Sequence, residues 1–176
     1  HGRTPWVKIP AMTPDTETHP AAALAAGDPP PFDVVNGASQ SRAVLLCDHA
    51  GRAIPRAYGA LGLDETVLRR HIAWDIGAGD VTRRLAQILG APAVLANYSR
   101  LFIDTNRHPG AAASIVEASD GVAIPGNADV DEAEKARRAS ASFWPYQNRV
   151  IRMIGEAEAR AGVVALICIH SFTPVM

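Results

Sequence analysis

The chain has 176 residues, of which 48% are hydrophobic and 20% are charged, a composition that predicts one soluble globular domain with a substantial apolar core. Seventeen basic and eighteen acidic residues leave a net charge of −1, which argues against nucleic-acid binding through phosphate neutralisation. No apolar run approaches the roughly 18–20 residues of a membrane span, and two cysteines are too few for a disulfide scaffold, so we expect a cytoplasmic protein.

The first part of the chain differs from the rest in its proline content. Seven of the thirteen prolines lie in residues 1–41, and the triplet at 29–31 favours extended backbone and excludes helix. On composition alone this part is predicted to be a tail or strap on the surface. Regular structure is therefore expected from Arg42 onward.

Four short apolar runs predict buried strands. Continuous apolar segments of this length are typical of parallel strands that are covered on both faces. The predicted strands are residues 43–47, 93–96, 101–103 and 163–169.

Helices are predicted between these strands. The predicted ranges are 64–70, 72–89 and about 129–160, the last broken or kinked at Pro145. In the second helix an apolar face is expected from Ile76, Val81, Leu85 and residues 88–89. Glycine and proline punctuation predicts a long loop over 108–127. The alternation predicts an α/β fold, a three-layer sandwich around a mostly parallel sheet.

Two predicted strands end alike, in Cys-Asp-His at 47–49 and Cys-Ile-His at 168–170. If these strands are parallel neighbours, His49 and His170 converge at the carboxyl edge of the sheet, with both cysteines one layer deeper on the same side. Two neutral imidazoles are the start of a Zn²⁺ site, which a carboxylate often completes. Alternatively, each histidine satisfies a loop carbonyl.

His71 and Asp75 are four residues apart in a predicted helix and would share one of its faces. They form either a ligand pair, or a carboxylate that orients an imidazole, or an exposed pair. The apolar neighbours of Asp75, which include Trp74, favour a buried position for this carboxylate.

Arg100 and Arg107 are candidates for recognising a substrate. Arginine suits bidentate capture of a carboxylate, so two arginines on one short segment could hold a dicarboxylate. Alternatively, they form structural ion pairs with Asp48, Asp75 or Asp104. No Gly-x-Ser-x-Gly elbow surrounds Ser171 and no phosphate-binding glycine loop occurs, which disfavours a serine hydrolase and a nucleotide-binding protein.

Seven short motifs follow one another over residues 28–176. They are Asp28–Phe32 (DPPPF), Cys47–Gly51 (CDHAG) with Ile54–Pro55, His71–Ala78 (HIAWDIGA), Tyr98–Arg107 (YSRLFIDTNR), Ser119–Gly121 with Ile124–Asn127, Trp144–Tyr146 (WPY) and Ile169–Pro174 (IHSFTP). Each is weak alone, but in this order they resemble the N-formylglutamate amidohydrolase (N-formylglutamate deformylase) family. The resemblance makes residues 28–176 the family domain and leaves residues 1–27 as a proline- and alanine-rich tail.

The resemblance implies a fold like that of the zinc-dependent exopeptidases, in the phosphorylase/hydrolase-like group. It also implies hydrolysis of the formamide bond of N-formyl-L-glutamate, or of a related small-molecule N-acyl amino acid, in amino-acid degradation such as histidine catabolism. Carried over motif by motif, the expected ligands of Zn²⁺ or another divalent transition metal are His49, Asp75 and His170. The expected catalytic residues are Arg100 and Asp104, and the expected substrate-binding residues are Arg100, Asn106, Arg107 and Ser171.

The chain departs from the family in its extent. The family domain normally continues past the His-Ser-Phe-Thr-Pro motif into segments that carry the catalytic carboxylate, whereas this chain ends at Met176. We therefore expect a domain whose C-terminal part, with the general base, is missing. Two alternatives stay open, namely a non-catalytic module that binds an anionic amino acid and an inactive fragment of the hydrolase.

Overall fold

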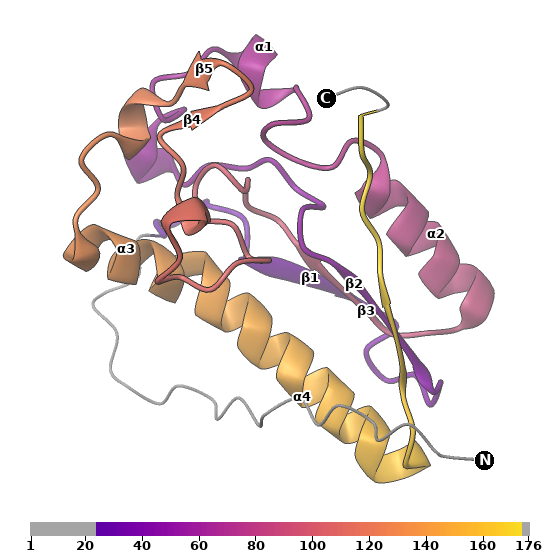
Figure 1. The fold of residues 1–176 in the computed structure, drawn as a ribbon. Helices are drawn as coiled ribbons and strands as arrows, with labels where there is room; N and C mark the ends of the chain where they lie inside the picture. Colours follow the sequence, from indigo (N-terminus) through magenta and orange to yellow (C-terminus); the bar gives the residue numbers. More distant parts are fainter. Residues whose placement is uncertain (1–23, 174–176) are drawn as a thin grey trace, which may run out of the picture.

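The structure, a computed structural model, describes residues 24–173 and is built around a four-stranded sheet (Figure 1). The strands, in spatial order, are β1 (Phe32–Val35), β3 (Ala93–Ala96), β2 (Ala43–Cys47) and β6 (Ala165–Cys168). β2 pairs in parallel with both β3 and β6, and β1 pairs antiparallel with β3. Helices α2 (Ala78–Leu89) and α4 (Trp144–Ala161) cover opposite faces of the sheet. The predicted α/β sandwich with a mostly parallel sheet is confirmed.

The two central strands are apolar along their length because both of their faces are covered. Val44 and Leu46 of β2 pack with side chains of α4, whereas Leu45 and Cys47 pack with side chains of α2. Every residue of β3 is buried. This continuous burial explains why the runs at 43–47 and 93–96 were recognisable as strands from the sequence.

The register between β2 and β6 is shifted by one residue from the expected one. Leu46, not Cys47, is the partner of Cys168. Because side chains alternate between the two faces of a sheet, the cysteines lie on opposite faces, with Cys47 buried and Cys168 exposed. The prediction that they lie together on one side is therefore wrong.

Two strand predictions need correction. Residues 101–103 form a turn instead of a strand, since the amide of Phe102 donates to the carbonyl of Ser99 and the amide of Leu101 donates to the Ser99 hydroxyl. The proline-rich first part contributes strand β1, which was not predicted. Of the predicted tail 1–27, residues 1–23 lie outside the described range.

The helix predicted over 72–89 starts later, at Ala78. Residues 71–77 form successive turns that end at Gly77, whose φ of 80° is the left-handed conformation that favours glycine. The helix predicted over 64–70 is reduced to α1 (Glu65–Leu68). His71 and Asp75 therefore do not share a helix face.

The third predicted helix is present and continuous. It consists of α3 (Glu132–Arg138), a π-helical turn (Ala139–Phe143) and α4, with Pro145 in the first turn of α4. Proline has no amide hydrogen to donate and cannot continue a regular helical ladder, so the backbone widens just before it. No helix within residues 24–173 is long and apolar enough to cross a membrane.

The predicted loop over 108–127 contains a small hairpin of β4 (Ala118–Ser119) and β5 (Val122–Ala123). Asp120 and Gly121 form its turn with φ angles of 49° and 72°. Positive φ at both central residues is what a tight two-residue hairpin turn requires, and an Asp-Gly pair adopts it readily.

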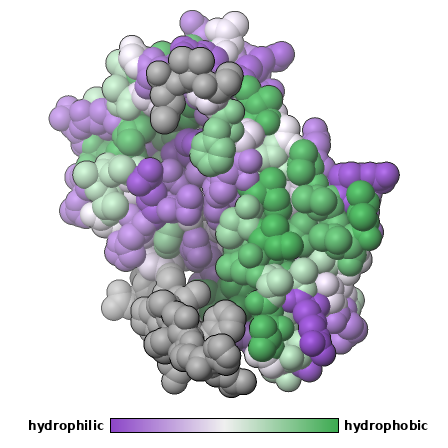
Figure 2. All heavy atoms as spheres, turned by 45° about the vertical axis from the view of Figure 1, so that its right-hand side comes forward, coloured by the Kyte–Doolittle hydropathy of each residue, from purple (hydrophilic) through white to green (hydrophobic). Residues whose placement is uncertain are grey.

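One side of the molecule exposes large apolar side chains (Figure 2). Of the expected apolar face of α2, Leu85 packs against the sheet together with small residues, but the other members are exposed, with Ile88 at 64% and Val81 at 51%. β6 is an edge strand whose four residues are all exposed. An exposed apolar face beside an unpaired strand edge is typical of a surface that contacts other polypeptide.

A substitution at Gly51 tests how closely the turn that follows β2 packs against the neighbouring backbone. A Cβ atom at Gly51 would lie 2.1 Å from the backbone oxygen of Asn97, so we expect Gly51→Ala to lower the free energy of unfolding by about 1–3 kcal/mol. Gly155→Ala in α4 is the control, because that Cβ has nothing within 4 Å and alanine favours helix by about 1 kcal/mol. Urea unfolding measures both, and equal stability of the two variants would contradict this packing.

Candidate metal centre and adjoining pocket

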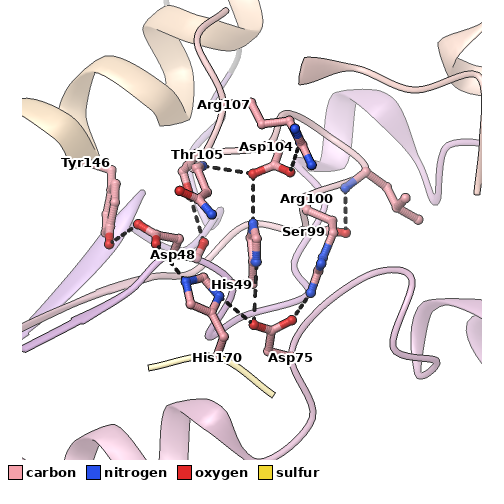
Figure 3. A network of polar contacts seen from close by, with 12 residues as sticks. Asp48, His49, Asp75, Ser99, Arg100, Asp104, Thr105, Arg107, Tyr146 and His170 are labelled. Atoms are coloured by element: carbon pink, nitrogen blue, oxygen red, sulfur yellow. Dashed lines mark hydrogen bonds and ion pairs between the residues drawn. The ribbon is translucent and has the colours of Figure 1, made fainter. Parts of the chain in front are cut away.

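Three of the predicted site residues meet beyond the carboxyl ends of β2 and β6 (Figure 3). His49 lies in the turn after β2, His170 follows β6, and Asp75 lies in the turns before α2. The amide of Asp75 donates to the carbonyl of His49 over 3.0 Å, which ties the turns before α2 to the sheet. Sites at this edge are typical of α/β sheets, because the strand-to-helix loops gather there.

The ligand atoms of this trio lie within 4.8 Å of one another. Oδ2 of Asp75 is 3.6 Å from Nδ1 of His49 and 2.9 Å from Nδ1 of His170. These distances bracket the roughly 3.4 Å that separates two ligands of a tetrahedral ion bound at about 2.1 Å. His49 and Asp75 are buried, and Nδ1 of His49 has no hydrogen-bond partner. A buried, unpartnered imidazole nitrogen next to a carboxylate fits a bound cation.

The other ring nitrogen of each histidine faces a second carboxylate. Nε2 of His49 lies 2.7 Å from Oδ1 of Asp104, and Nε2 of His170 lies 3.4 Å from Oδ2 of Asp48. The Tyr146 hydroxyl donates to Oδ1 of Asp48 over 2.8 Å. Burial and the nearby charge of Asp48 raise the pKa of Tyr146 well above its ordinary value, so this hydroxyl keeps its proton.

Arg100 pairs with the carboxylate of Asp75 from the other side. Its Nη2 atom donates to Oδ1 of Asp75, and its buried Nε atom has no partner. Burial lowers the pKa of Arg100, but a guanidinium remains charged at neutral pH. Arg100 therefore partly neutralises Asp75 and keeps further N–H groups for another ligand.

Asp104 lies on the opposite side of His49 from Asp75, in the segment that follows residues 101–103 (Figure 3). Burial raises the pKa of Asp104, but the hydrogen bond from His49, the amide of Asn106 and the charge of Arg100 lower it by more, so the carboxyl stays ionised. Arg107 approaches its Oδ2 atom at 3.4 Å. Both arginines thus form the ion pairs that the sequence left open as an alternative.

A pocket of about 410 Å³ adjoins the trio. Its lining includes Asp75, Arg100 and Ser171 and combines charged groups with an apolar side chain. The remaining lining residues are His71, Asp120, Phe172 and Thr173. Its volume suits a small molecule, and its charged groups suit a polar one.

The structure does not gather every predicted site residue at this pocket. Asn106 and Arg107 are exposed and are not part of the lining, and Asp104 contacts His49 instead of the pocket. His71 lies 3.8 Å from Asp120 and lines the pocket together with Asp75, but the two residues do not share a helix face, because the predicted helix does not extend over them.

Asp48 and Tyr146 are polar members of the network that sequence reasoning did not place there. The sequence suggested Asp48 as a possible partner for an arginine and placed Tyr146 only within the Trp-Pro-Tyr motif. Tyr146 is fully buried with its hydroxyl directed at Asp48, although the two are 98 residues apart. The signal available in the sequence was a tyrosine on the buried side of an amphipathic helix, where a hydroxyl needs a partner.

Comparison with known proteins adds evidence to this geometry. The family model for N-formylglutamate amidohydrolase matches residues 41–176. No curated protein sequence matches the chain.

Two solved structures share the fold. The product of gene Atu2144 from Agrobacterium tumefaciens is 40% identical, with a TM-score of 0.82, over 87% of this chain and 61% of its own. An N-formylglutamate amidohydrolase from Ralstonia eutropha JMP134 is 20% identical, with a TM-score of 0.53, over 82% of this chain and 58% of its own. The chain thus spans about three-fifths of each of these proteins.

Proposed function

The chain belongs to the N-formylglutamate amidohydrolase family, and from this premise we propose that it carries the metal centre of a hydrolase for N-formyl-L-glutamate or a related N-acyl amino acid. The observation that supports this proposal best is the trio of His49, Asp75 and His170, with its unpartnered imidazole nitrogen. Asp75 belongs both to the trio and to the lining of the pocket, so a bound metal would lie next to a substrate held there.

Zn²⁺ is the metal that we propose for this trio. Two imidazoles and one carboxylate, with a further position open to water or substrate, form a ligand set typical of catalytic zinc. When bound, the ion would supply a Lewis acid for the formyl oxygen and lower the pKa of a coordinated water to about 7.

The chain's own residues would bind and orient the substrate. Arg100 lines the pocket, its side chain is 27% exposed, and its free N–H groups suit either a substrate carboxylate or the negative charge that develops on the formyl oxygen. Ser171 lines the same pocket and offers a hydroxyl. Asn106 and Arg107 remain proposed contacts for the substrate carboxylates, because they are exposed on the loop that follows Arg100.

The carboxylate that moves a proton to the leaving nitrogen is proposed to come from outside these residues. Asp75 is held by Arg100 and His170, and Asp120, the other carboxylate of the pocket lining, pairs with Arg70 at 2.6 Å. The solved relatives are longer than this chain, and the exposed face of α2 and β6 offers a surface for additional chain. An intact mass above 18.6 kDa for the natural protein would support this part of the proposal.

Formate release from N-formyl-L-glutamate tests the activity. We expect the natural protein to release formate with Zn²⁺ or Co²⁺ bound, and we expect chelation to lower the rate at least about 100-fold, reversibly, because the metal activates both water and carbonyl. N-acetyl-L-glutamate and N-formyl-L-leucine, tested in parallel, report on the acyl group and on the side-chain carboxylate. A metal-loaded protein that releases no formate from N-formyl-L-glutamate would contradict the proposed substrate.

The second candidate is a metal-free module that binds an anionic amino acid through arginine. Its support is weaker, because Arg100 is already paired with Asp75 while Nδ1 of His49 has no partner. Metal analysis separates the two candidates, since a module would bind glutamate with less than one metal ion per chain.

A further inference from the structure

The outer nitrogens of both candidate ligand histidines are held by carboxylates that do not belong to the metal trio. Asp104 contacts Nε2 of His49 at 2.7 Å, and Asp48 faces Nε2 of His170 at 3.4 Å. In both rings the opposite nitrogen, Nδ1, is the one that lies near Asp75. Both histidines thus direct Nδ1 at Asp75, although they follow different strands and their ring planes are inclined by 62° (Figure 3).

The contact between His49 and Asp104 determines where the proton of the imidazole lies. A neutral imidazole carries one N–H, and an ionised carboxylate only accepts hydrogen bonds. His49 must therefore keep its hydrogen on Nε2, where it donates to Oδ1 of Asp104. The lone pair is then on Nδ1, the buried atom that has no hydrogen-bond partner among residues 24–173.

We propose that Asp104 is a positioning residue that fixes His49 in the Nε2–H tautomer and directs its Nδ1 lone pair at the metal. This inference rests on the proposed metal centre. Carboxylate–histidine–metal arrangements of this kind hold the ring in place and make the imidazole a stronger ligand.

The surroundings of Asp104 support a fixed orienting role for its carboxylate. Oδ1 of Asp104 also accepts from the amide of Asn106 at 2.8 Å, and Oδ1 of Asp48 accepts from Tyr146. The hydroxyl of Thr105 donates to the carbonyl of Asp48 over 2.7 Å, which ties the two carboxylate-bearing segments together. Asp104 is 8% exposed and is not part of the pocket lining, so it acts through His49 and not on the substrate.

The tautomer of His49 is measurable without metal or substrate. Long-range ¹H–¹⁵N correlation spectra of the metal-free wild-type protein should show an unprotonated Nδ1 and a protonated Nε2 for His49. The opposite tautomer, with the proton on Nδ1, would overturn the proposal whatever the activity of the enzyme.

Zn²⁺ affinity supplies the second test. We expect Asp104→Leu, which removes the acceptor, to weaken Zn²⁺ binding by about 10–100-fold, and Asp104→Asn, which keeps an oxygen, to weaken it less. Asp33→Asn is the matched control, because Asp33 pairs with Arg83 and Asn97 and has no contact with either histidine. Affinity of Asp104→Leu within twofold of wild type would overturn the positioning role alone, whereas absence of Zn²⁺ binding by wild type would overturn it together with the metal centre.

Discussion

Replacement of His170 by alanine is expected to lower the Zn²⁺ affinity by more than about 100-fold and to abolish formate release. The loss should exceed the roughly 10–100-fold cost of disturbing a residue that only orients a ligand, because a ligand itself is removed. The side chain of His170 is 20% exposed and lies at the open end of the sheet, so its truncation leaves the packed core of the sandwich intact. The metal-free variant is therefore expected to fold as the wild type does.

Equilibrium titration with Zn²⁺ and metal analysis after gel filtration measure this effect. His108→Ala is the matched control, since His108 is an exposed histidine whose Nδ1 atom accepts only from the nearby amide of Gly110. The control should retain wild-type affinity. One tightly bound Zn²⁺ per chain in His170→Ala would show that His170 is not a ligand.

Replacement of Arg138 by methionine is expected to lower the free energy of unfolding by about 3–5 kcal/mol, the usual cost of breaking a buried ion pair. Arg138 is only 2% exposed, and its guanidinium donates to Glu134, to the carbonyls of Phe102 and Gly126, and to Oδ1 of Asn127. The variant leaves these acceptors without their donor in the interior. Because Phe102 lies in the turn that leads to Asp104, this substitution is also expected to loosen the segment that holds His49.

Arg137→Ala is the control for this prediction, because Arg137 binds the same Glu134 carboxylate with 43% of its side chain accessible, so its loss should destabilise the fold much less. Urea unfolding of both variants provides the comparison. Equal destabilisation by the two substitutions would contradict the prediction that the buried Arg138 stabilises the fold more than Arg137 does.

The pH dependence of unfolding gives a second readout of the Arg138 network. Burial raises the pKa of Glu134, but the hydrogen bonds from Arg138, Tyr58 and Arg137 outweigh it, so the folded-state pKa lies below the ordinary 4.5. The stabilisation is therefore complete above about pH 4.5 and is lost as the pH falls through the lower folded-state pKa. In Arg138→Met, the free energy of unfolding should therefore fall less steeply as the pH decreases in this acid range. The same pH dependence in the variant and the wild type would show that Arg138 does not lower the pKa of Glu134.

Local sequence patterns predicted those parts of the fold whose secondary structure is determined by residues that are neighbours in the chain. The apolar runs at 43–47 and 93–96 are strands because both of their faces are buried. The segment at 101–103 has a similar composition but is a turn, since three apolar residues do not distinguish a strand from a buried turn. The hydroxyl of Ser99, which bonds to the amide of Leu101 and the carbonyl of Ala73, stabilises that turn.

The prediction of which side of α2 is buried was largely wrong for a related reason. The helix is apolar on more than one side, and periodicity does not indicate which side meets the sheet. The structure presses the small residues Ala78, Gly79 and Ala86 onto the sheet, where the backbone comes close, and leaves Val81 and Ile88 outside. The close approach of helix and sheet, not hydrophobicity alone, selects the buried side.

By residue type and order alone, the sequence determined the α/β class, the likeness to a hydrolase family and three candidate metal ligands. Only the tertiary structure decided which nitrogen of each histidine faces Asp75, that Asp104 is hydrogen-bonded to the opposite nitrogen of His49, and that Arg100 is paired with Asp75. These features depend on atomic distances between segments such as His49 and Asp104, 55 residues apart, or Asp75 and His170, 95 residues apart. The packing of the whole sheet sets those distances, and no pattern of neighbouring residues contains them.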